Sequence, residues 1–298
     1  SQAVAMLSDF SEHDIVQNTF KEASAALGYD LWQLVAQGPV DKLNQTNFTQ
    51  PALLTASVAL WRVWQAESVV MPTVLAGHSL GEYSALVCAE VISLAEGVKL
   101  VEKRGEYMQA CVPAGIGAMA AVIGLDDQAI IDACQQAQAE EVVAAVNFNS
   151  PGQVVIAGHK AAVERAGELC KAAGAKRVLP LPVSVPSHCA LMTDAADKLA
   201  ADLESITFNT PKINVVNNVD VVVETTGEAI KLALIKQLYS PVRWSETITQ
   251  LGEQGVTQMV EVGPGKVLQG LVKRINKSIT CVSFKSEVTL AKAKELTQ

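Results

Sequence analysis

The sequence predicts an α/β protein made of a large unit and a smaller inserted unit. Around Ser79, an apolar strand, a Gly-x-Ser-x-Gly turn and a helix follow one another directly,. Between residues 112 and 184 the pattern changes to strand, helix, strand, strand, helix, strand,. From residue 185 onward, strands and helices alternate again. The 298 residues are enough to bury a large core together with a smaller one,.

Composition and charge exclude several classes of protein. Hydrophobic residues make up 49% of the chain and charged residues 18%, which is typical of a soluble globular protein,. The net charge of −8 argues against a nucleic-acid-binding protein, which would carry a basic excess,. We find no apolar run long enough to cross a membrane and no signal-peptide pattern,. The six cysteines are scattered without a C-x-x-C pair, so we expect reduced thiols in the cytoplasm and no metal site,.

The first part of the chain is predicted to be helical. Residues 1–45 are mostly helical in pattern and carry no chemistry of their own. Residues 49–64 are apolar almost all round. A helix of this kind has no face to offer to water, so we expect it to be buried against the sheet.

The turn at Ser79 has the features of a nucleophile elbow. An apolar run at 69–76, broken by Met71-Pro72-Thr73, predicts the strand before it,. We expect the turn to require glycine at positions 77 and 81, because a Cβ at either position would collide with the neighbouring strand or helix. The start of the following helix favours negative charge that develops on the serine oxygen. The alternative is a helix-capping serine, but the order of strand, turn and helix favours a nucleophile.

A buried cation is predicted on the next helix, residues 94–111. The apolar face of this helix has Arg104 in its middle,. A guanidinium stays charged, so burying one without an anionic partner is costly. One interpretation is an internal salt bridge to an Asp or Glu. The other is a pocket arginine that binds a substrate carboxylate with its two-pronged donor geometry, and the pattern alone favours neither.

The inserted unit, residues 112–184, is predicted to be a split βαβ unit of the ferredoxin-like type. We interpret 149–152 as a turn and His159 as a capping or surface residue,. Strands are expected at 117–124, 142–147, 153–157 and 176–182, and helices at 126–139 and 160–173,.

The chain returns to the large unit in a Pro-Ser-His turn that ends at His188. A helix starts at or just after this residue, and an imidazole near a helix N-terminus is biased toward the neutral form that a general base needs. The alternative is a turn histidine exposed to water. The other histidines are His13, His78 and His159, and His78 cannot easily turn back onto its neighbour's hydroxyl. If Ser79 is a nucleophile, His188 is therefore its best partner.

The rest of the chain continues the alternation of strands and helices. We interpret the Gly263-Pro264-Gly265 turn as a tight connection, because no Walker Lys-Ser/Thr pair accompanies it,. Strands are expected at 213–219 and 258–262, and helices at 229–239, 245–252 and 267–275,.

Five short segments occur in a fixed order along the chain. They are Gly77-His78-Ser79-Leu80-Gly81-Glu82-Tyr83-Ser84-Ala85, Glu102-Lys103-Arg104-Gly105, Asn147-Phe148-Asn149-Ser150-Pro151-Gly152-Gln153, Pro186-Ser187-His188 and Glu261-Val262-Gly263-Pro264-Gly265. Together they resemble the malonyl-CoA:acyl carrier protein transacylase family of bacterial type II fatty acid synthesis. The likeness runs from Ser1 to about Phe284 and is far more specific than the Gly-x-Ser-x-Gly turn alone.

The resemblance implies a division into two domains with the active site between them. Residues 1–111 and 185–298 would form an α/β-hydrolase-like large domain, and residues 112–184 a ferredoxin-like small domain. The family pattern begins with a strand and a Gly-Gln-Gly-Ser-Gln loop, of which Ser1-Gln2 is the part in this sequence. That loop supplies one of the two oxyanion donors in the family.

The same resemblance implies roles for five residues. Ser79 would be the nucleophile and His188 its base. Arg104 would bind the substrate carboxylate, which favours the second of its two interpretations. The backbone N–H of Leu80 would be an oxyanion donor, and the backbone carbonyl of Gln237 would orient His188 in place of a third acid.

The implied reaction is transfer of a malonyl group from malonyl-CoA to the phosphopantetheine thiol of acyl carrier protein, through a malonyl-serine. No cofactor is expected, since the coenzyme A thioester is the substrate, and we expect a monomer. The carrier protein is acidic and so is this chain, so docking requires a local basic patch,. Candidates are Lys176, Arg177, Lys266, Lys273, Arg274 and Lys277, and for each the alternative is a solvated charge at a helix end.

Two other functions stay open. A serine esterase or thioesterase would need an Asp or Glu that reaches His188, and it would release free acid. No Asp or Glu between residues 79 and 188 lies in a convincing strand-end loop. A carrier-binding module would keep the fold and bind the carrier without forming an acyl-serine.

Overall fold

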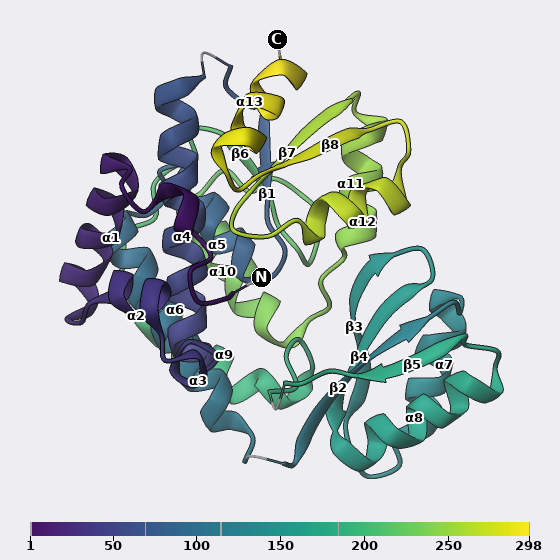
Figure 1. Ribbon diagram of the computed structural model, residues 1–298. Helices are drawn as coiled ribbons and strands as arrows, with labels where there is room; N and C mark the ends of the chain where they lie inside the picture. Colours follow the sequence, from purple (N-terminus) through teal and green to yellow (C-terminus); the bar gives the residue numbers. More distant parts are fainter. Residues whose placement is uncertain (1, 69, 114, 184, 298) are drawn as a thin grey trace.

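A computed structural model describes residues 2–68, 70–113, 115–183 and 185–297 (Figure 1). Predictions that begin or end at Ser1, Val69, Ser184 or Gln298 lie outside the described residues at those points. The helices are η1 (Ser8–Phe10), α1 (Asp14–Leu27), α2 (Leu31–Gln37), α3 (Val40–Leu43), α4 (Thr46–Glu67), α5 (Leu80–Cys88), α6 (Leu94–Cys111), α7 (Asp127–Ala137), α8 (Lys160–Ala172), η2 (Ala190–Met192), α9 (Thr193–Glu204), α10 (Gly227–Tyr239), α11 (Trp244–Glu253), α12 (Val267–Ile275) and α13 (Glu287–Leu296). The strands are β1 (Val74–Ala76), β2 (Gly117–Ile123), β3 (Val143–Ser150), β4 (Gln153–His159), β5 (Arg177–Pro180), β6 (Asn214–Val216), β7 (Gln258–Val262) and β8 (Thr280–Phe284).

The strands of the described ranges form three sheets. β1 pairs with β6, and β7 pairs with β8, both in parallel. The third sheet has the order β3-β4-β2-β5, and its neighbouring strands are antiparallel. Helices α7 and α8 cover one face of this third sheet, at the lower right of Figure 1. This arrangement of helices with parallel and antiparallel strands confirms the predicted α/β class.

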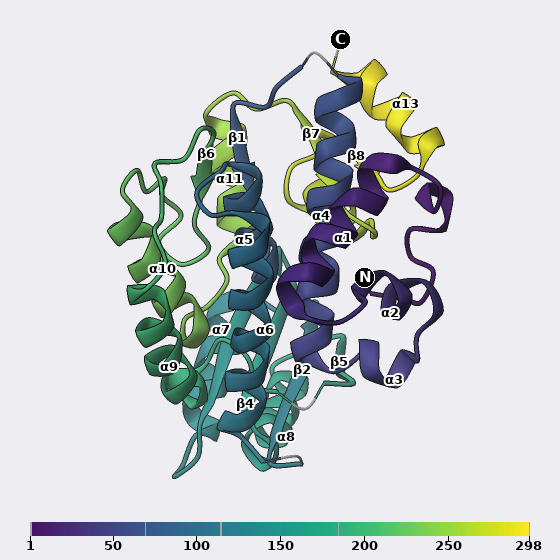
Figure 2. The same cartoon turned by 90° about the vertical axis from the view of Figure 1, so that its left-hand side faces the viewer.

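The core of the larger part is built around α4. This helix is buried on nearly every side, as its all-round apolar pattern predicted, and Leu54 and Leu60 are fully buried,. Helices α4, α5 and α6 lie side by side (Figure 2). Helix α5 contributes Tyr83 and Leu86 to the same apolar cluster. The turn that precedes α5 is therefore attached to the main core.

The four-stranded sheet lies against the segment that holds His188. The sheet face opposite α7 and α8 includes Val146 and packs on Cys189, the residue that follows this histidine. Backbone hydrogen bonds also join β3 of this sheet to the segment between α10 and α11. The Val242 N–H donates to the Val146 carbonyl (2.9 Å), and the Val242 carbonyl accepts from the Phe148 N–H (3.0 Å). The residues around His188 are thus held between the two parts of the molecule.

Two predicted strands of the larger part are longer than the observed ones. The strand expected at 69–76 is reduced to β1, since Pro72 has no N–H to give to a neighbouring strand,. The strand expected at 213–219 is reduced to β6. There the Asn217 side chain accepts hydrogen bonds from the following backbone N–H groups, which turns the chain out of the sheet,.

The turn predicted at 149–152 is shorter than expected. Ser150 still belongs to β3 and pairs with Gln153 of β4, so Pro151 and Gly152 alone connect the two strands. Gly152 has a φ of 69°, which a glycine adopts without strain,. Strand β8 and helix α13 were not predicted. Among the described residues, no helix is both long and apolar enough to cross a membrane.

Candidate active site

Ser79 occupies a strained turn between β1 and α5. Its φ of 53° and ψ of −108° are unusual for a residue with a side chain, and such strain is concentrated at functional sites,. A Cβ on Gly77 would lie 2.0 Å from the Gly81 carbonyl group, so only glycine fits at position 77. A Cβ on Gly81 would meet nothing within 4 Å. The expected collision is therefore confirmed for Gly77 and wrong for Gly81, because the first turn of α5 directs position 81 toward open space.

The Ser79 hydroxyl lies against the imidazole of His188. The distance from Oγ to Nε2 is 2.8 Å. The other ring nitrogen, Nδ1, lies 2.8 Å from the backbone carbonyl oxygen of Gln237. A carbonyl can only accept, so the proton is assigned to Nδ1, and Nε2 is left to accept from the serine. His188 is 3% exposed, which makes the alternative of a water-exposed turn histidine wrong.

Burial keeps His188 neutral. Its pKa is lowered from 6.5 to about 3, first because the site is desolvated and second because the positive Arg104 is near,. The prediction of a neutral imidazole had a different basis, the N-terminus of the following helix. The neutral form is the one that can remove a proton from Ser79 at pH 7.

Arg104 reaches the same point from α6, is buried, and among the described residues forms hydrogen bonds to neutral groups alone. Its guanidinium donates to Gln50 Oε1 (2.7 Å), to Gln237 Oε1 (3.0 Å) and to Ser79 Oγ (3.2 Å), and it lies over the Tyr83 ring. Within the described ranges it forms no ion pair, and its Nε has no hydrogen-bond acceptor. The internal salt bridge is therefore not found. A buried cation with neutral partners suits the binding of an anion beside Ser79.

The backbone N–H of Leu80, the first residue of α5, also belongs to this site. Leu80 follows Ser79, and within the described part of the chain its backbone N–H has no hydrogen-bond acceptor. The Ser79 N–H, in contrast, donates to Asn218 Oδ1 (2.6 Å). Leu80 therefore has a donor free for an oxygen that becomes negative, at the positive end of the helix dipole.

The sequence was compared with known protein families and relatives. Residues 8–294 match the acyl transferase domain family. This chain belongs to the acyl transferase domain family. It is 62% identical over 297 residues to the malonyl CoA-acyl carrier protein transacylase of Escherichia coli K12, covering 99% of this chain and 96% of the relative. It is 43% identical to the protein of the same name from Bacillus subtilis, covering 97% and 92%.

Solved structures of acyl transferases have the same fold. The acyl carrier protein S-malonyltransferase of Vibrio cholerae has a TM-score of 0.97 and 63% identity, with 99% of this chain and 96% of that one covered. A malonyl-transacylase in complex with its type II polyketide synthase acyl-carrier protein has a TM-score of 0.97 and 58% identity, with the same coverage. These findings confirm the resemblance that the five sequence segments indicated.

Three residues of this acyl transferase site were missed in the sequence. They are Gln50, Glu82 and Asn218, whose side chains contact the residues described above. Asn218 follows β6, which is parallel to β1, and the carboxyl ends of parallel neighbours meet at one edge of a sheet, so its position was a usable signal,. Gln50 left no comparable signal, because four of the first five residues of α4 are polar.

His78 is not part of the pair, in agreement with its expected inability to turn back onto Ser79. Its Nε2 lies 2.8 Å from Asn149 Oδ1, at the end of β3. His159 occupies the N-cap position of α8, as expected, but its side chain does not cap the helix: its Nδ1 accepts the Val142 N–H (2.9 Å).

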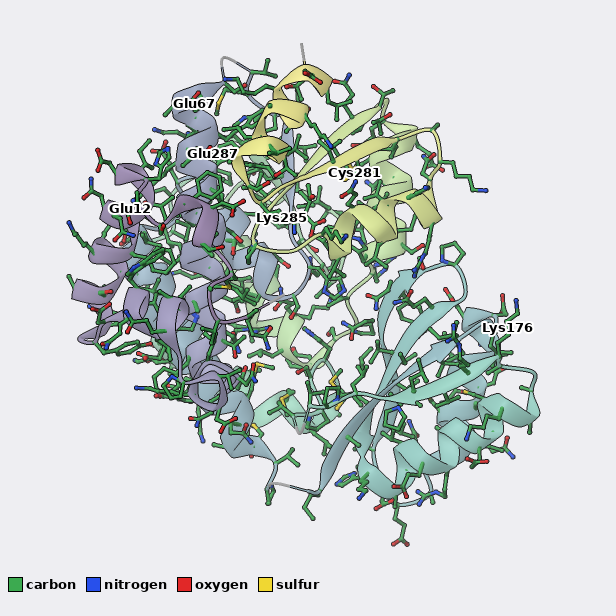
Figure 3. All side chains as sticks on the ribbon, in the orientation of Figure 1. Glu12, Glu67, Lys176, Cys281, Lys285 and Glu287 are labelled. Carbon is green, nitrogen blue, oxygen red and sulfur yellow. The ribbon has the colours of Figure 1, made fainter. Side chains whose placement is uncertain are left out.

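The candidate docking residues are exposed, and some of them meet at one end of the four-stranded sheet. Arg177 begins β5 and Lys176 directly precedes it, and Figure 3 shows Lys176 at the outer side of the acyl transferase's smaller part. Arg177 and Gln153 both pair with Ile123, one on each side of β2. Arg177 therefore lies about two strand spacings, or 10 Å, from Gln153,. Arg274 of α12 donates to the Gln153 side chain, so Arg177 and Arg274 lie near the same sheet end. The other candidates, Lys266, Lys273 and Lys277, are exposed around α12.

Proposed function

We propose that this protein transfers a malonyl group from malonyl-CoA to the phosphopantetheine thiol of acyl carrier protein. One observation carries the proposal: the buried Arg104 guanidinium, with neutral partners, lies 3.2 Å from the hydroxyl that His188 can deprotonate. A carboxylate that binds there sits next to an acyl group on Ser79. The names of the relatives from Escherichia coli and Vibrio cholerae support the same substrate and carrier.

In the proposed first half-reaction, Ser79 Oγ attacks the thioester carbonyl carbon as His188 Nε2 takes its proton. The carbonyl oxygen becomes negative and accepts from the Leu80 N–H. When the carbon–sulfur bond breaks, coenzyme A leaves and takes the proton from His188. The Gln237 carbonyl holds Nδ1–H throughout, so it stabilises the imidazolium that forms between the two proton transfers,.

In the second half-reaction, the carrier thiol gives its proton to His188 and attacks the malonyl ester of Ser79. The carbon–oxygen bond then breaks and the serine oxygen takes the proton back. Arg104 holds the free carboxylate in both steps and therefore favours a diacid over a simple acyl group. Serine, imidazole, a backbone N–H and guanidinium supply every group that these steps need, so we propose no cofactor.

We further propose the domain division that the sequence predicted. The strand order β3-β4-β2-β5, with two helices on one face, supports a ferredoxin-like small domain at 112–184,. The strained serine between β1 and α5 supports an α/β-hydrolase-like large domain at 1–111 and 185–298,. Six free cysteines support a reducing compartment, the cytoplasm,. We also propose a monomer that docks the carrier at Lys176, Arg177, Lys273 and Arg274.

The two alternative functions have less support. A serine hydrolase of the Ser–acid–His type needs a carboxylate on His188, whereas Nδ1 lies against the Gln237 carbonyl,. A carrier-binding module without turnover does not need a nucleophile and a base 2.8 Å apart.

Mass spectrometry after brief mixing with malonyl-CoA tests the proposal. We expect a malonyl adduct on Ser79 that disappears when carrier protein is added, and no adduct in Ser79→Ala. Arg104→Ala should lose malonyl transfer far more than acetyl transfer, because the acetyl group has no carboxylate to bind. Release of free malonate without carrier would favour a hydrolase, and carrier binding without any adduct would favour a binding module.

A further inference from the structure

Glu82 is a buried carboxyl that the proposed reaction does not use. It lies in the first turn of α5, three residues after the nucleophile, and is 2% exposed. Its Oε2 accepts from the Asn218 backbone N–H (3.0 Å) and from Gln237 Nε2 (2.8 Å). Each of these two partners in turn contacts a proposed reacting group. A carboxyl buried this deeply is retained against its desolvation cost, so its two contacts need an explanation.

We propose that Glu82 is a positioning residue that sets Ser79 through Asn218 and Arg104 through Gln237. The inference rests on the proposed roles of Ser79 and Arg104 and adds to them the residue that positions both.

The first connection runs through Asn218 to the strained turn. Its side-chain amide accepts from the Ser79 N–H (2.6 Å) and donates to the Gly77 carbonyl (2.7 Å). One carboxamide thus joins both sides of the turn and takes up the serine N–H, while the Leu80 N–H stays free. Glu82 fixes the backbone of the same asparagine, and so fixes where this carboxamide lies.

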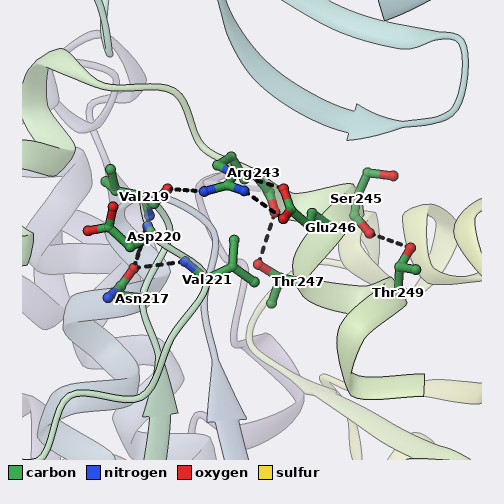
Figure 4. A network of polar contacts seen from close by, with 9 residues as sticks. All are labelled: Asn217, Val219, Asp220, Val221, Arg243, Ser245, Glu246, Thr247 and Thr249. Atoms are coloured by element: carbon green, nitrogen blue, oxygen red, sulfur yellow. Dashed lines mark hydrogen bonds and ion pairs between the residues drawn. The ribbon is translucent and has the colours of Figure 1, made fainter. Parts of the chain in front are cut away.

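The loop that carries Asn218 is braced from its other side as well. Asn217 Oδ1 accepts from the N–H groups of Val219, Asp220 and Val221, and Arg243 donates to the Val219 carbonyl (2.9 Å), as Figure 4 shows. Val221 has a φ of 57°, which is rare for a β-branched residue,. A loop held in so strained a form does not find its place by backbone preference, and Glu82 is its contact on the side of the serine.

The second connection runs through the side chain of Gln237. Its Nε2 donates to Glu82 Oε2 and to the Ser79 carbonyl (3.1 Å), and the carbonyl can only accept,. This fixes the orientation of the amide, so that Oε1 faces Arg104 Nη2. In the reversed orientation an NH₂ group would face the guanidinium and the carboxylate would lose its donor. Glu82, together with the Ser79 carbonyl, thereby determines that Gln237 offers an acceptor to the arginine.

Substitutions of Glu82 that keep or remove its acceptor test the proposal. In Glu82→Ala the Asn218 N–H loses its acceptor and Gln237 Nε2 keeps only the Ser79 carbonyl. We expect acylation of Ser79 in a single turnover to fall at least about tenfold with either malonyl-CoA or acetyl-CoA, the effect of a displaced reacting group. The ratio of malonyl to acetyl rates should fall too, because Arg104 is no longer fixed. Glu82→Gln keeps an oxygen where Oε2 lies, so it should restore most of both values.

The two connections are separated by single variants. Asn218→Ala should slow both thioesters by the same factor, and Gln237→Met, which keeps the backbone carbonyl on His188, should lower the malonyl to acetyl ratio. The matched control is Glu106→Gln, which removes a carboxyl group at an exposed position on α6 and should leave rates and ratio unchanged.

A purely structural carboxyl would give a different result. The proposal is overturned if Glu82→Ala acylates at the wild-type rate and ratio, if its rate falls with an unchanged ratio, or if Glu82→Gln loses as much as Glu82→Ala while still folded by circular dichroism. Ser79→Ala and Arg104→Ala are measured alongside. If these two behave as proposed and Glu82→Ala does not, the positioning role fails alone; if Ser79→Ala still forms the adduct, the proposed function fails.

Discussion

The four-stranded sheet and the turn that carries Ser79 are built in opposite ways. In the sheet, β2 pairs with β4 over its whole length, from Gly117 opposite His159 to Ile123 opposite Gln153, through backbone groups alone. At the turn, β1 has only three residues, and the geometry comes from side chains that lie 109 and 139 positions away, His188 and Asn218. A regular ladder tolerates many apolar side chains, whereas the turn depends on a few particular groups. Substitutions at the turn should therefore change the rate of the reaction out of proportion to their size.

The largest effect of a small substitution is expected at Gly77. In Gly77→Ala the new Cβ would lie 2.0 Å from the backbone of Gly81, so the turn cannot form as it is. We expect the free energy of unfolding to fall by more than about 3 kcal/mol and acylation of Ser79 to be lost, as for other overpacked backbone contacts. Denaturant unfolding and mass spectrometry measure the two effects.

Gly81→Ala is the matched control, because it adds the same methyl group four residues later in open space. Its free energy of unfolding should change by less than about 1 kcal/mol, since alanine also favours a helix. Equal losses of unfolding free energy in the two variants would contradict the conclusion that the turn excludes a Cβ at position 77 and not at position 81.

The sheet was largely predictable from the sequence, and the site only in part. Alternation of strands and helices along 117–182 follows from local apolar periodicity, so each element was placed within a few residues. The Gly-x-Ser-x-Gly turn and His188 were found because a strained turn and a scarce residue type leave a local signal. Gln237, Leu80 and the choice between the interpretations of Arg104 came from the family resemblance, since nothing local indicates which backbone carbonyl will reach a distant imidazole.

The roles of Glu82 and Asn218 could not be predicted from the residues next to them in the sequence. Glu82 looks like any acid in the first turn of a helix, where the dipole favours it. Asn218 looks like a turn residue at a strand end. Their roles depend on three-dimensional contacts over 136 and 139 positions of sequence, which no local pattern records.

A change of pH is expected to have a moderate effect on the free energy of unfolding, and this effect arises at His188 in the site and not in the sheet. The unfolded chain protonates His188 near its ordinary pKa of 6.5, whereas the folded chain does so only near 3. The unfolded state therefore binds more protons below pH 6.5, so the folded state loses stability as the pH falls, by about 1.4 kcal/mol per pH unit. Relative to His188→Gln, the wild type should lose about 2 kcal/mol between pH 7.5 and 5.

Thermal or denaturant unfolding of both proteins across this range measures the difference. Ser79→Ala keeps the buried imidazole and serves as the control, so its stability should follow the wild type. Parallel curves for the wild type and His188→Gln would mean that the imidazole is not held neutral in the fold. Glu82 acts in the opposite direction: burial raises its pKa from 4.5 to about 7, so it weakens the folded state as the pH rises from 4.5 to 7,.

The smallest effect is expected at the outer end of the sheet, at Arg177. This side chain is exposed at the start of β5 and lies near the same sheet end as Arg274. An exposed charge adds little to the binding of an acidic partner, so Arg177→Glu should raise the KM for carrier protein only about twofold to fivefold, and more at low salt than at high salt. The rate at which malonyl-CoA acylates Ser79 should not change, because the sheet end is not part of the turn. A KM that stays constant at low salt would remove this face from the docking surface, and a slower acylation would mean that the two regions are coupled.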